Sequence, residues 1–128
     1  ELDAVVLPGG MPGTLNLEKS ETVINTVKYC YDNGRYVCAI CAAPSILGHL
    51  GILEGRKACC FPGFEDELRG AVLGNDFVCC DSKVITAKGM GSAIDFSEKI
   101  TACLINENKA KKIKNLFSVP INEKGGRI

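Results

Sequence analysis

The sequence lacks the ingredients of several common kinds of site. It has 128 residues, one histidine and no tryptophan, so a site built on histidine pairs within this chain is excluded. Lys plus Arg and Asp plus Glu each number 15, which gives no reason to expect nucleic acid or an anionic membrane as a partner. No secretory signal peptide and no apolar run long enough to span a bilayer is recognisable, so the expected compartment is the cytoplasm.

The length predicts a single domain over residues 1–128, because a chain of this size buries about two-thirds of its unfolded surface. The eight cysteines lie mostly inside apolar segments, where they are expected to behave as small buried hydrophobes rather than as a disulfide framework. Neighbours on a strand point to opposite faces, so neither Cys59-Cys60 nor Cys79-Cys80 can grip one metal ion. We therefore expect no metal and no cofactor.

Apolar periodicity predicts alternating strands and helices, and hence right-handed crossovers and a mostly parallel sheet with one antiparallel hairpin. Residues 2–7 open the chain as an apolar strand that would leave an uncovered sheet edge. We expect either residues absent from this chain or another chain to cover it. The first half of the chain is further expected to form a loop or short turn at 11–19, a helix at 21–33, a strand at 36–40 and a helix at 44–50. The second half is expected to form a strand at 57–61, a helical turn at 65–68, hairpin strands at 77–80 and 84–87, a helix capped by Ser92, and a last helix at 109–116.

The stretch from Val37 to Pro44 predicts a strand, a sharp turn at Cys41 and a helix. This is the pattern of a nucleophile elbow, whose neighbours must be small, as Ala39 and Ala43 are. A helix starting at Pro44 would offer free N–H groups that favour a thiolate. A buried strand cysteine before a helix would have much the same local sequence.

Potential helpers of Cys41 are few. His49 would lie about 12 Å further along the same helix, so it is expected to be a surface or packing residue. Gly9-Gly10 follows the neighbouring strand, and its N–H groups could converge with that of Ala42 on an oxyanion. Among carboxylates, Glu65 and Asp66 are the best of a weak set.

Three motifs together resemble the DJ-1/PfpI superfamily, and within it the DJ-1/ThiJ group often labelled as 4-methyl-5(β-hydroxyethyl)-thiazole monophosphate biosynthesis proteins. The motifs, at the family's spacing, are Val5-Val6-Leu7-Pro8-Gly9-Gly10, Ala39-Ile40-Cys41-Ala42-Ala43-Pro44 and Gly89-x-Gly91-x-Ala93-Ile94-Asp95-Phe96. The resemblance implies a flavodoxin-like α/β sandwich, usually a homodimer, with a reactive cysteine at Cys41. It also implies oxyanion-type amides at Gly10 and Ala42, supported at the elbow by Gly9, Ala43 and Pro44.

The sequence departs from the family pattern in two places. Many relatives have a histidine where this chain has Phe61, just before Pro62. The family's opening strand-helix-strand, with a glutamic acid that hydrogen-bonds the cysteine, would precede Glu1, so we expect the chain to be part of a longer protein.

The expected function is cysteine-dependent action on small reactive carbonyls, of glyoxalase or deglycase type, or peroxide sensing through Cys41. Two alternatives remain open. One is a non-catalytic, chaperone-like interaction module. The other is a cysteine peptidase or amidotransferase-type hydrolase that takes a histidine from another chain.

Overall fold

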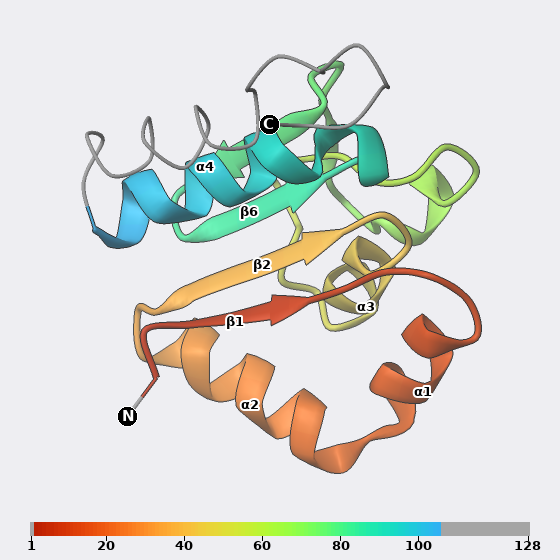
Figure 1. The fold of residues 1–128 in the computed structure, drawn as a ribbon. Helices are drawn as coiled ribbons and strands as arrows, with labels where there is room; N and C mark the ends of the chain where they lie inside the picture. Colours follow the sequence, from red (N-terminus) through yellow and green to blue (C-terminus); the bar gives the residue numbers. More distant parts are fainter. Residues whose placement is uncertain (1, 106–128) are drawn as a thin grey trace, which may run out of the picture.

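A central four-stranded sheet organises residues 2–105, the part of the chain that the computed structural model describes (Figure 1). Its strand order is β1-β2-β6-β5, with β1–β2 and β2–β6 parallel and β5–β6 antiparallel. The four strands are β1 (Ala4–Leu7), β2 (Tyr36–Ile40), β5 (Val78–Asp81) and β6 (Val84–Ala87). The expected α/β class and mostly parallel, flavodoxin-like sheet with one antiparallel hairpin are confirmed.

Helices cover both faces of this sheet, and their positions follow from local signals. In α2 (Glu21–Asp32), the Ser20 side chain caps the helix by accepting a hydrogen bond from the Val23 N–H at 3.3 Å. Gly34 stops the chain after α2 with a φ of 68°, a conformation that glycine adopts without strain. The remaining α-helices are α1 (Gly13–Lys19), α3 (Pro44–His49) and α4 (Ala93–Leu104).

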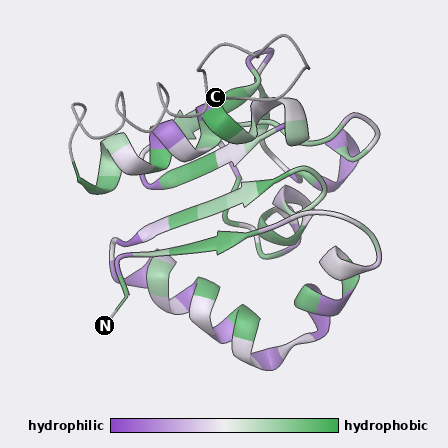
Figure 2. Cartoon of the chain, in the orientation of Figure 1, coloured by the Kyte–Doolittle hydropathy of each residue, from purple (hydrophilic) through white to green (hydrophobic). Residues whose placement is uncertain are grey.

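Side chains alternate between two hydrophobic layers. Val37 and Ala39 of β2 face the layer under α2 and α3, whereas Cys38 faces α4. The apolar residues accordingly line the strands and the inner helix surfaces in Figure 2. Every position of β6 is buried, because β6 lies between β2 and β5 under both layers.

Two expectations about local structure were wrong, and one strand was missed. Residues 13–19 form α1 rather than a loop, because the Gly10 carbonyl accepts hydrogen bonds from both the N–H and the hydroxyl of Thr14, each at 2.8 Å. The strand expected at 57–61 is only β3 (Lys57–Ala58), and it pairs outside the main sheet with β4 (Val72–Leu73), which was missed. The helix expected at 109–116 lies outside the described residues. Two short 3₁₀ helices, η1 (Glu65–Glu67) and η2 (Met90–Ser92), complete the fold.

The first strand lies at an edge of the sheet within the described residues, as expected. Val6 pairs with Cys38 and so points to the face that α4 covers, yet its side chain is 48% exposed. Helix α4 covers β2, β6 and β5 but leaves this part of β1 open.

His49 joins three elements next to the carboxyl ends of the parallel strands. Its Nδ1 contacts the Glu18 carboxylate of α1, and its Nε2 lies 2.8 Å from Glu67 Oε1 of η1. Gly48 allows this close packing, because a Cβ there would lie 2.8 Å from the Leu68 Cα. The hydrogen bond to Glu18 is the largest cause that raises the pKa of His49, and the hydrogen bond to Glu67 also raises it. Burial and the positive charge of Arg69 lower this pKa, but by less. His49 is therefore a linker between α1, α3 and η1, consistent with the structural role expected for it.

We predict that this linker makes stability depend on pH. Because the pKa of His49 is higher in the folded than in the unfolded chain, its contribution is complete below the unfolded value and is lost as pH rises through the folded value. Below about pH 7.5 the thiols stay protonated in both states, so urea unfolding between about pH 6 and pH 7.5 reports on this only histidine and should show a loss of about 1 kcal/mol with rising pH. The His49→Gln variant should show a flat profile, and an unchanged slope in that variant would contradict the assignment.

Candidate functional site

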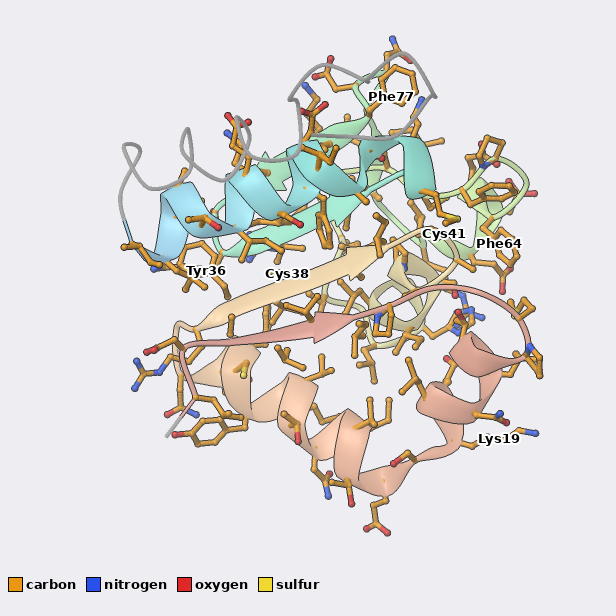
Figure 3. All side chains as sticks on the ribbon, viewed as in Figure 1. Lys19, Tyr36, Cys38, Cys41, Phe64 and Phe77 are labelled. Carbon is orange, nitrogen blue, oxygen red and sulfur yellow. The ribbon has the colours of Figure 1, made fainter. Side chains whose placement is uncertain are left out.

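Cys41 lies on a sharp turn between β2 and α3, at the carboxyl end of the parallel strands (Figure 3). Its φ is 66°, in the left-handed region that a non-glycine residue seldom occupies. Two hydrogen bonds hold it there: its N–H donates to the Ala87 carbonyl at 3.0 Å, and its carbonyl accepts the Phe61 N–H at 2.7 Å. The strand, turn and helix predicted around Cys41 are confirmed.

Gly9 presses directly against this turn. A Cβ at Gly9 would lie 2.7 Å from the Ile40 carbonyl oxygen and 3.1 Å from the Ala42 nitrogen, and it would overlap the Cys41 Cβ. Only glycine fits such an approach, so the loop after β1 and the turn after β2 meet at one point. The structure thus brings Gly9 and Gly10 beside Cys41, the neighbourhood expected from the order of the strands.

Two amides at this point are available as donors. Neither the Gly10 N–H nor the Ala42 N–H donates to a backbone carbonyl of residues 2–105, while both residues' carbonyls are engaged. The Gly10 carbonyl accepts from Thr14, and the Ala42 carbonyl accepts from the Ser45 N–H at 3.1 Å and the Ser45 hydroxyl at 2.7 Å. The Ala42 N–H shares its peptide plane with the Cys41 carbonyl, which the Phe61 N–H holds, so the direction of this N–H is fixed. The buried Ser45, which sequence reasoning missed, is part of this support.

The start of α3 is built as the sequence suggested. Ala43 is the N-cap and is completely buried, so only a small side chain fits there. Pro44 occupies the first helical position, where its missing N–H costs nothing. With six residues, α3 is a short helix, and Cys41 stands just before its cap.

Most other thiols are too buried to react readily. Burial is the leading cause that raises the pKa of Cys38 to about 12, of Cys79 to about 12 and of Cys60 to about 11. Cys30 and Cys59 have raised pKa values for the same reason. The thiols that are not buried belong to Cys41, Cys80 and Cys103. Accessibility therefore separates Cys41 from five of the other seven cysteines.

None of the side chains considered as partners is joined to Cys41 by a hydrogen bond or an ion pair within the described part of the chain. Hydrogen bonds from its own backbone N–H and, next, from the Gly63 N–H at 2.7 Å lower the pKa of the exposed Glu65 carboxyl group. His49 is held by its two glutamates, as described above. Cys60, missed as a neighbour, interacts electrostatically with Cys41 and stays a neutral thiol near pH 7 because its pKa is high.

An apolar depression of about 330 Å³ is lined by Phe61, Pro62, Phe77 and the segment from Lys88 to Ser92. Its link to Cys41 is the backbone of Phe61, whose N–H donates to the Cys41 carbonyl. Gly89 allows the Phe61 ring to lie close, since a Cβ there would contact the ring at 3.4 Å. The depression is therefore one residue removed from the cysteine along the backbone hydrogen bond.

No group of three or more His, Cys, Asp or Glu side chains within residues 2–105 is placed to hold a metal ion. Among the helices of this range, none has the length and apolar character needed to cross a bilayer.

Fold and site together define an α/β protein with an accessible cysteine on a sharp strand-to-helix turn. The chain belongs to the DJ-1/PfpI family, whose model matches residues 1–103. It is 36% identical to protein DJ-1 homolog A of Arabidopsis thaliana over 90% of this chain and 30% of that protein. It is 37% identical to a deglycase of Pyrococcus abyssi over 66% of this chain and 48% of that protein.

Solved structures give the same result. Oxidized DJ-1 of Toxoplasma gondii superposes with a TM-score of 0.83 at 36% identity, covering 88% of this chain and 62% of that one. DJ-1beta of Drosophila melanogaster gives a TM-score of 0.84 at 29% identity, covering 94% and 66%. The chain therefore spans less than two-thirds of several of the relatives that it matches.

We predict that the contact at Gly9 controls the shape of the elbow. A methyl group in Gly9→Ala would overlap Cys41, so this variant should lose about 1–3 kcal/mol of unfolding free energy and should slow Cys41 alkylation. Gly13→Ala is the matched control, because a Cβ there meets no atom within 4 Å. Urea unfolding and iodoacetamide labelling followed by peptide mapping measure both effects. Equal results for the two variants would contradict the prediction.

Proposed function

We propose that Cys41 is the reactive thiolate of a DJ-1-like protein and that it adds to small reactive carbonyl compounds such as methylglyoxal. The observation that carries this proposal is the juxtaposition of an accessible thiol at positive φ with two amides, of Gly10 and Ala42, that donate to no backbone carbonyl of residues 2–105. The deglycase of Pyrococcus abyssi among the relatives supports carbonyl chemistry.

In the proposed step, the Cys41 sulfur attacks the carbonyl carbon, a C–S bond forms, and the carbonyl π electrons move to the oxygen. The Gly10 and Ala42 amides then hold the resulting oxyanion, which becomes a hemithioacetal on taking up a proton. Backbone donors suit this task because they are already aimed before the charge develops. The apolar depression beside Phe61 would receive the methyl group of the carbonyl compound.

Peroxide oxidation of Cys41 is the second candidate, and a specific observation favours it. Phe61 stands where many relatives have a histidine, so the described residues offer no side-chain base to Cys41. Oxidation to sulfenic and then sulfinic acid needs an accessible thiolate and no base. An oxidized DJ-1 from Toxoplasma gondii is among the similar structures.

The remaining proposals concern partners. We propose that a second copy of this chain, or another chain, covers β1, since Val6 and Leu2 are exposed at this edge. A hydrolase of the same fold would need a histidine from that partner, because His49 is already bound to two carboxylates. A chaperone-like module would need no reactive Cys41 at all.

We predict that Cys41→Ser lowers methylglyoxal turnover at least about a hundredfold, because a serine hydroxyl in this setting is a far weaker nucleophile. Cys80→Ser is the control, since it removes another exposed thiol that lies on β5 away from the elbow. Turnover is followed by loss of methylglyoxal and by appearance of lactate. Equal rates in Cys41→Ser and the parent would overturn the nucleophile assignment.

Peroxide oxidation of Cys41, the second candidate function, is tested on the same proteins by a different measurement. After mild hydrogen peroxide, intact-mass measurement and peptide mapping should find oxygen added at Cys41 before any other of the eight cysteines. Oxygen spread evenly over the cysteines would reject a tuned thiol at Cys41.

A further inference from the structure

Two accessible thiols, those of Cys80 and Cys103, lie together at the other end of the sheet. In the strand register Cys80 pairs with Ile85, and Ile85 pairs with Cys38. Residues directly opposite one another share a face, so Cys80 points to the α4 side, as Cys38 does. Cys103 of α4 packs onto this same cluster, and its side chain interacts directly with that of Cys80.

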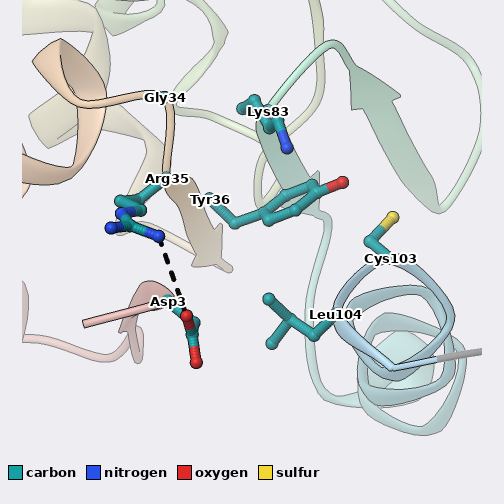
Figure 4. Close-up of a pocket in the computed structure, with 7 residues that line it drawn as sticks. All are labelled: Asp3, Gly34, Arg35, Tyr36, Lys83, Cys103 and Leu104. Carbon is teal, nitrogen blue, oxygen red and sulfur yellow. Dashed lines mark ion pairs between the residues drawn. The ribbon is translucent and has the colours of Figure 1, made fainter. Parts of the chain in front are cut away.

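This pair is remote from Cys41. Cys80 is beside the hairpin turn that joins β5 to β6, and Cys103 lines a cavity of about 250 Å³ with Tyr36 and Lys83. Figure 4 shows Cys103 on α4 at the edge of that cavity, with Tyr36 and Lys83 nearby. Tyr36 begins β2 and Cys41 follows its end, so the cavity and the elbow lie at opposite ends of the strand (Figure 3).

Solvent access distinguishes this pair from the other neighbouring thiols. Cys80 is exposed and Cys103 is partly exposed, whereas Cys59 and Cys79, which also interact with each other, are both buried. Cys38 lies close to the pair, but it is fully buried and its pKa is raised to about 12, so it remains a thiol. Two sulfurs, rather than three, are open to a small oxidant.

Solvent exposure suggests an order of reaction. Cys80 is exposed and Cys103 only partly exposed, so a small oxidant reaches Cys80 first. Burial and the neighbouring Cys103 raise the pKa of the Cys80 thiol, and Asp81 adds to this, so its reaction is expected to be faster at higher pH. Lys99, one helical turn before Cys103 on α4, opposes this shift in pKa.

We propose that Cys80 and Cys103 form a reversible redox pair that closes to a disulfide when a hydroperoxide oxidises it. The Cys80 thiolate attacks one peroxide oxygen, the O–O bond breaks, and Cys80 becomes a sulfenic acid while the second oxygen leaves as water. The Cys103 sulfur then attacks the Cys80 sulfur, an S–S bond forms, and the hydroxyl group leaves as a second water. The two thiols thus lose two electrons and two protons, and one hydrogen peroxide becomes two waters.

A disulfide here would have a structural effect. It would tie the last turn of α4 to β5 across the layer that contains Phe96 and Ile100. This would restrain the end of α4 without touching the elbow at Cys41. The chain would then respond to peroxide at a second place, whatever the chemistry of Cys41.

The test uses the full chain with Cys41→Ser, so that oxidation at the elbow does not interfere. After limited hydrogen peroxide, alkylation with N-ethylmaleimide should show two thiols lost and no oxygen gained, and peptide mapping should join the peptides that hold Cys80 and Cys103. Dithiothreitol should restore both thiols. Their loss should also speed up as pH rises from about 7 to about 9, because the raised pKa of Cys80 limits the thiolate fraction.

Matched variants distinguish the thiol that attacks the peroxide, Cys80, from the thiol that closes the disulfide, Cys103. In Cys103→Ser, Cys80 should accumulate as a sulfenic acid that dimedone traps, and in Cys80→Ser thiol loss should be about tenfold slower. Cys59→Ser, which breaks the buried pair, should leave the link unchanged. A link between Cys59 and Cys79, or separate oxidation of Cys80 and Cys103 to sulfinic acids, would overturn the proposal.

A second measurement does not rely on oxidation or on variants of the pair. Phenylarsine oxide bridges two neighbouring thiols, so one equivalent added to the Cys41→Ser protein should protect Cys80 and Cys103 together from N-ethylmaleimide. Full alkylation of both in its presence would show that the two sulfurs cannot meet, and this too would overturn the proposal.

Discussion

The fold depends on one close backbone contact, that of Gly9 with the turn at Cys41. At this point a Cβ would lie 2.7 Å from the Ile40 carbonyl oxygen, so any side chain would push the two loops apart. The contact forces the loop after β1 to run over the end of β2. It thereby brings the glycine loop, through Gly9, against the turn that carries Cys41 and Ala42.

The neighbouring elements hold this contact in place from outside. Thr14 binds the Gly10 carbonyl twice, so α1 anchors the glycine loop. His49 then joins α1 to α3 and to η1 through Glu18 and Glu67. The histidine is thus several bonds removed from the sulfur, and its influence on Cys41 is exerted through the position of α1. This separates its role from that of a catalytic base, which must reach the reacting atoms.

The parts of the fold that the sequence predicted correctly are those with local physical signals. Ser20 and Gly34 mark the two ends of α2, and the small residues Ala39 and Ala43 mark the elbow. Residues 13–19 carry no such signal, because Pro12-Gly13 is typical of a loop. They form a helix because Leu17 packs against the core and Thr14 binds the Gly10 carbonyl.

Features that depend on residues far apart in the sequence were not predicted, for a different reason. The strand expected at 57–61 ends at Ala58 because the next N–H, that of Cys59, donates to the Thr86 hydroxyl at 3.0 Å instead of to a neighbouring strand. The meeting of Cys80 and Cys103 depends on the register of β5 on β6 and on where α4 crosses the sheet. Neither quantity is encoded in the residues next to either cysteine, so the pair was not predictable from local sequence.

The contact of Phe61 with the turn at Cys41 bears on the chemistry that the elbow could perform with its described residues. The Phe61 N–H still holds the Cys41 carbonyl at 2.7 Å, so the backbone keeps the turn in place although the side chain offers no base. In the proposed chemistry the elbow would have two tasks that need only backbone, namely presenting the sulfur and receiving an oxyanion. Carbonyl addition needs both tasks and oxidation needs only the first, whereas amide hydrolysis also needs an acid to protonate the leaving nitrogen. The described residues bond no such acid to Cys41, so in the hydrolase alternative a partner chain would have to supply it.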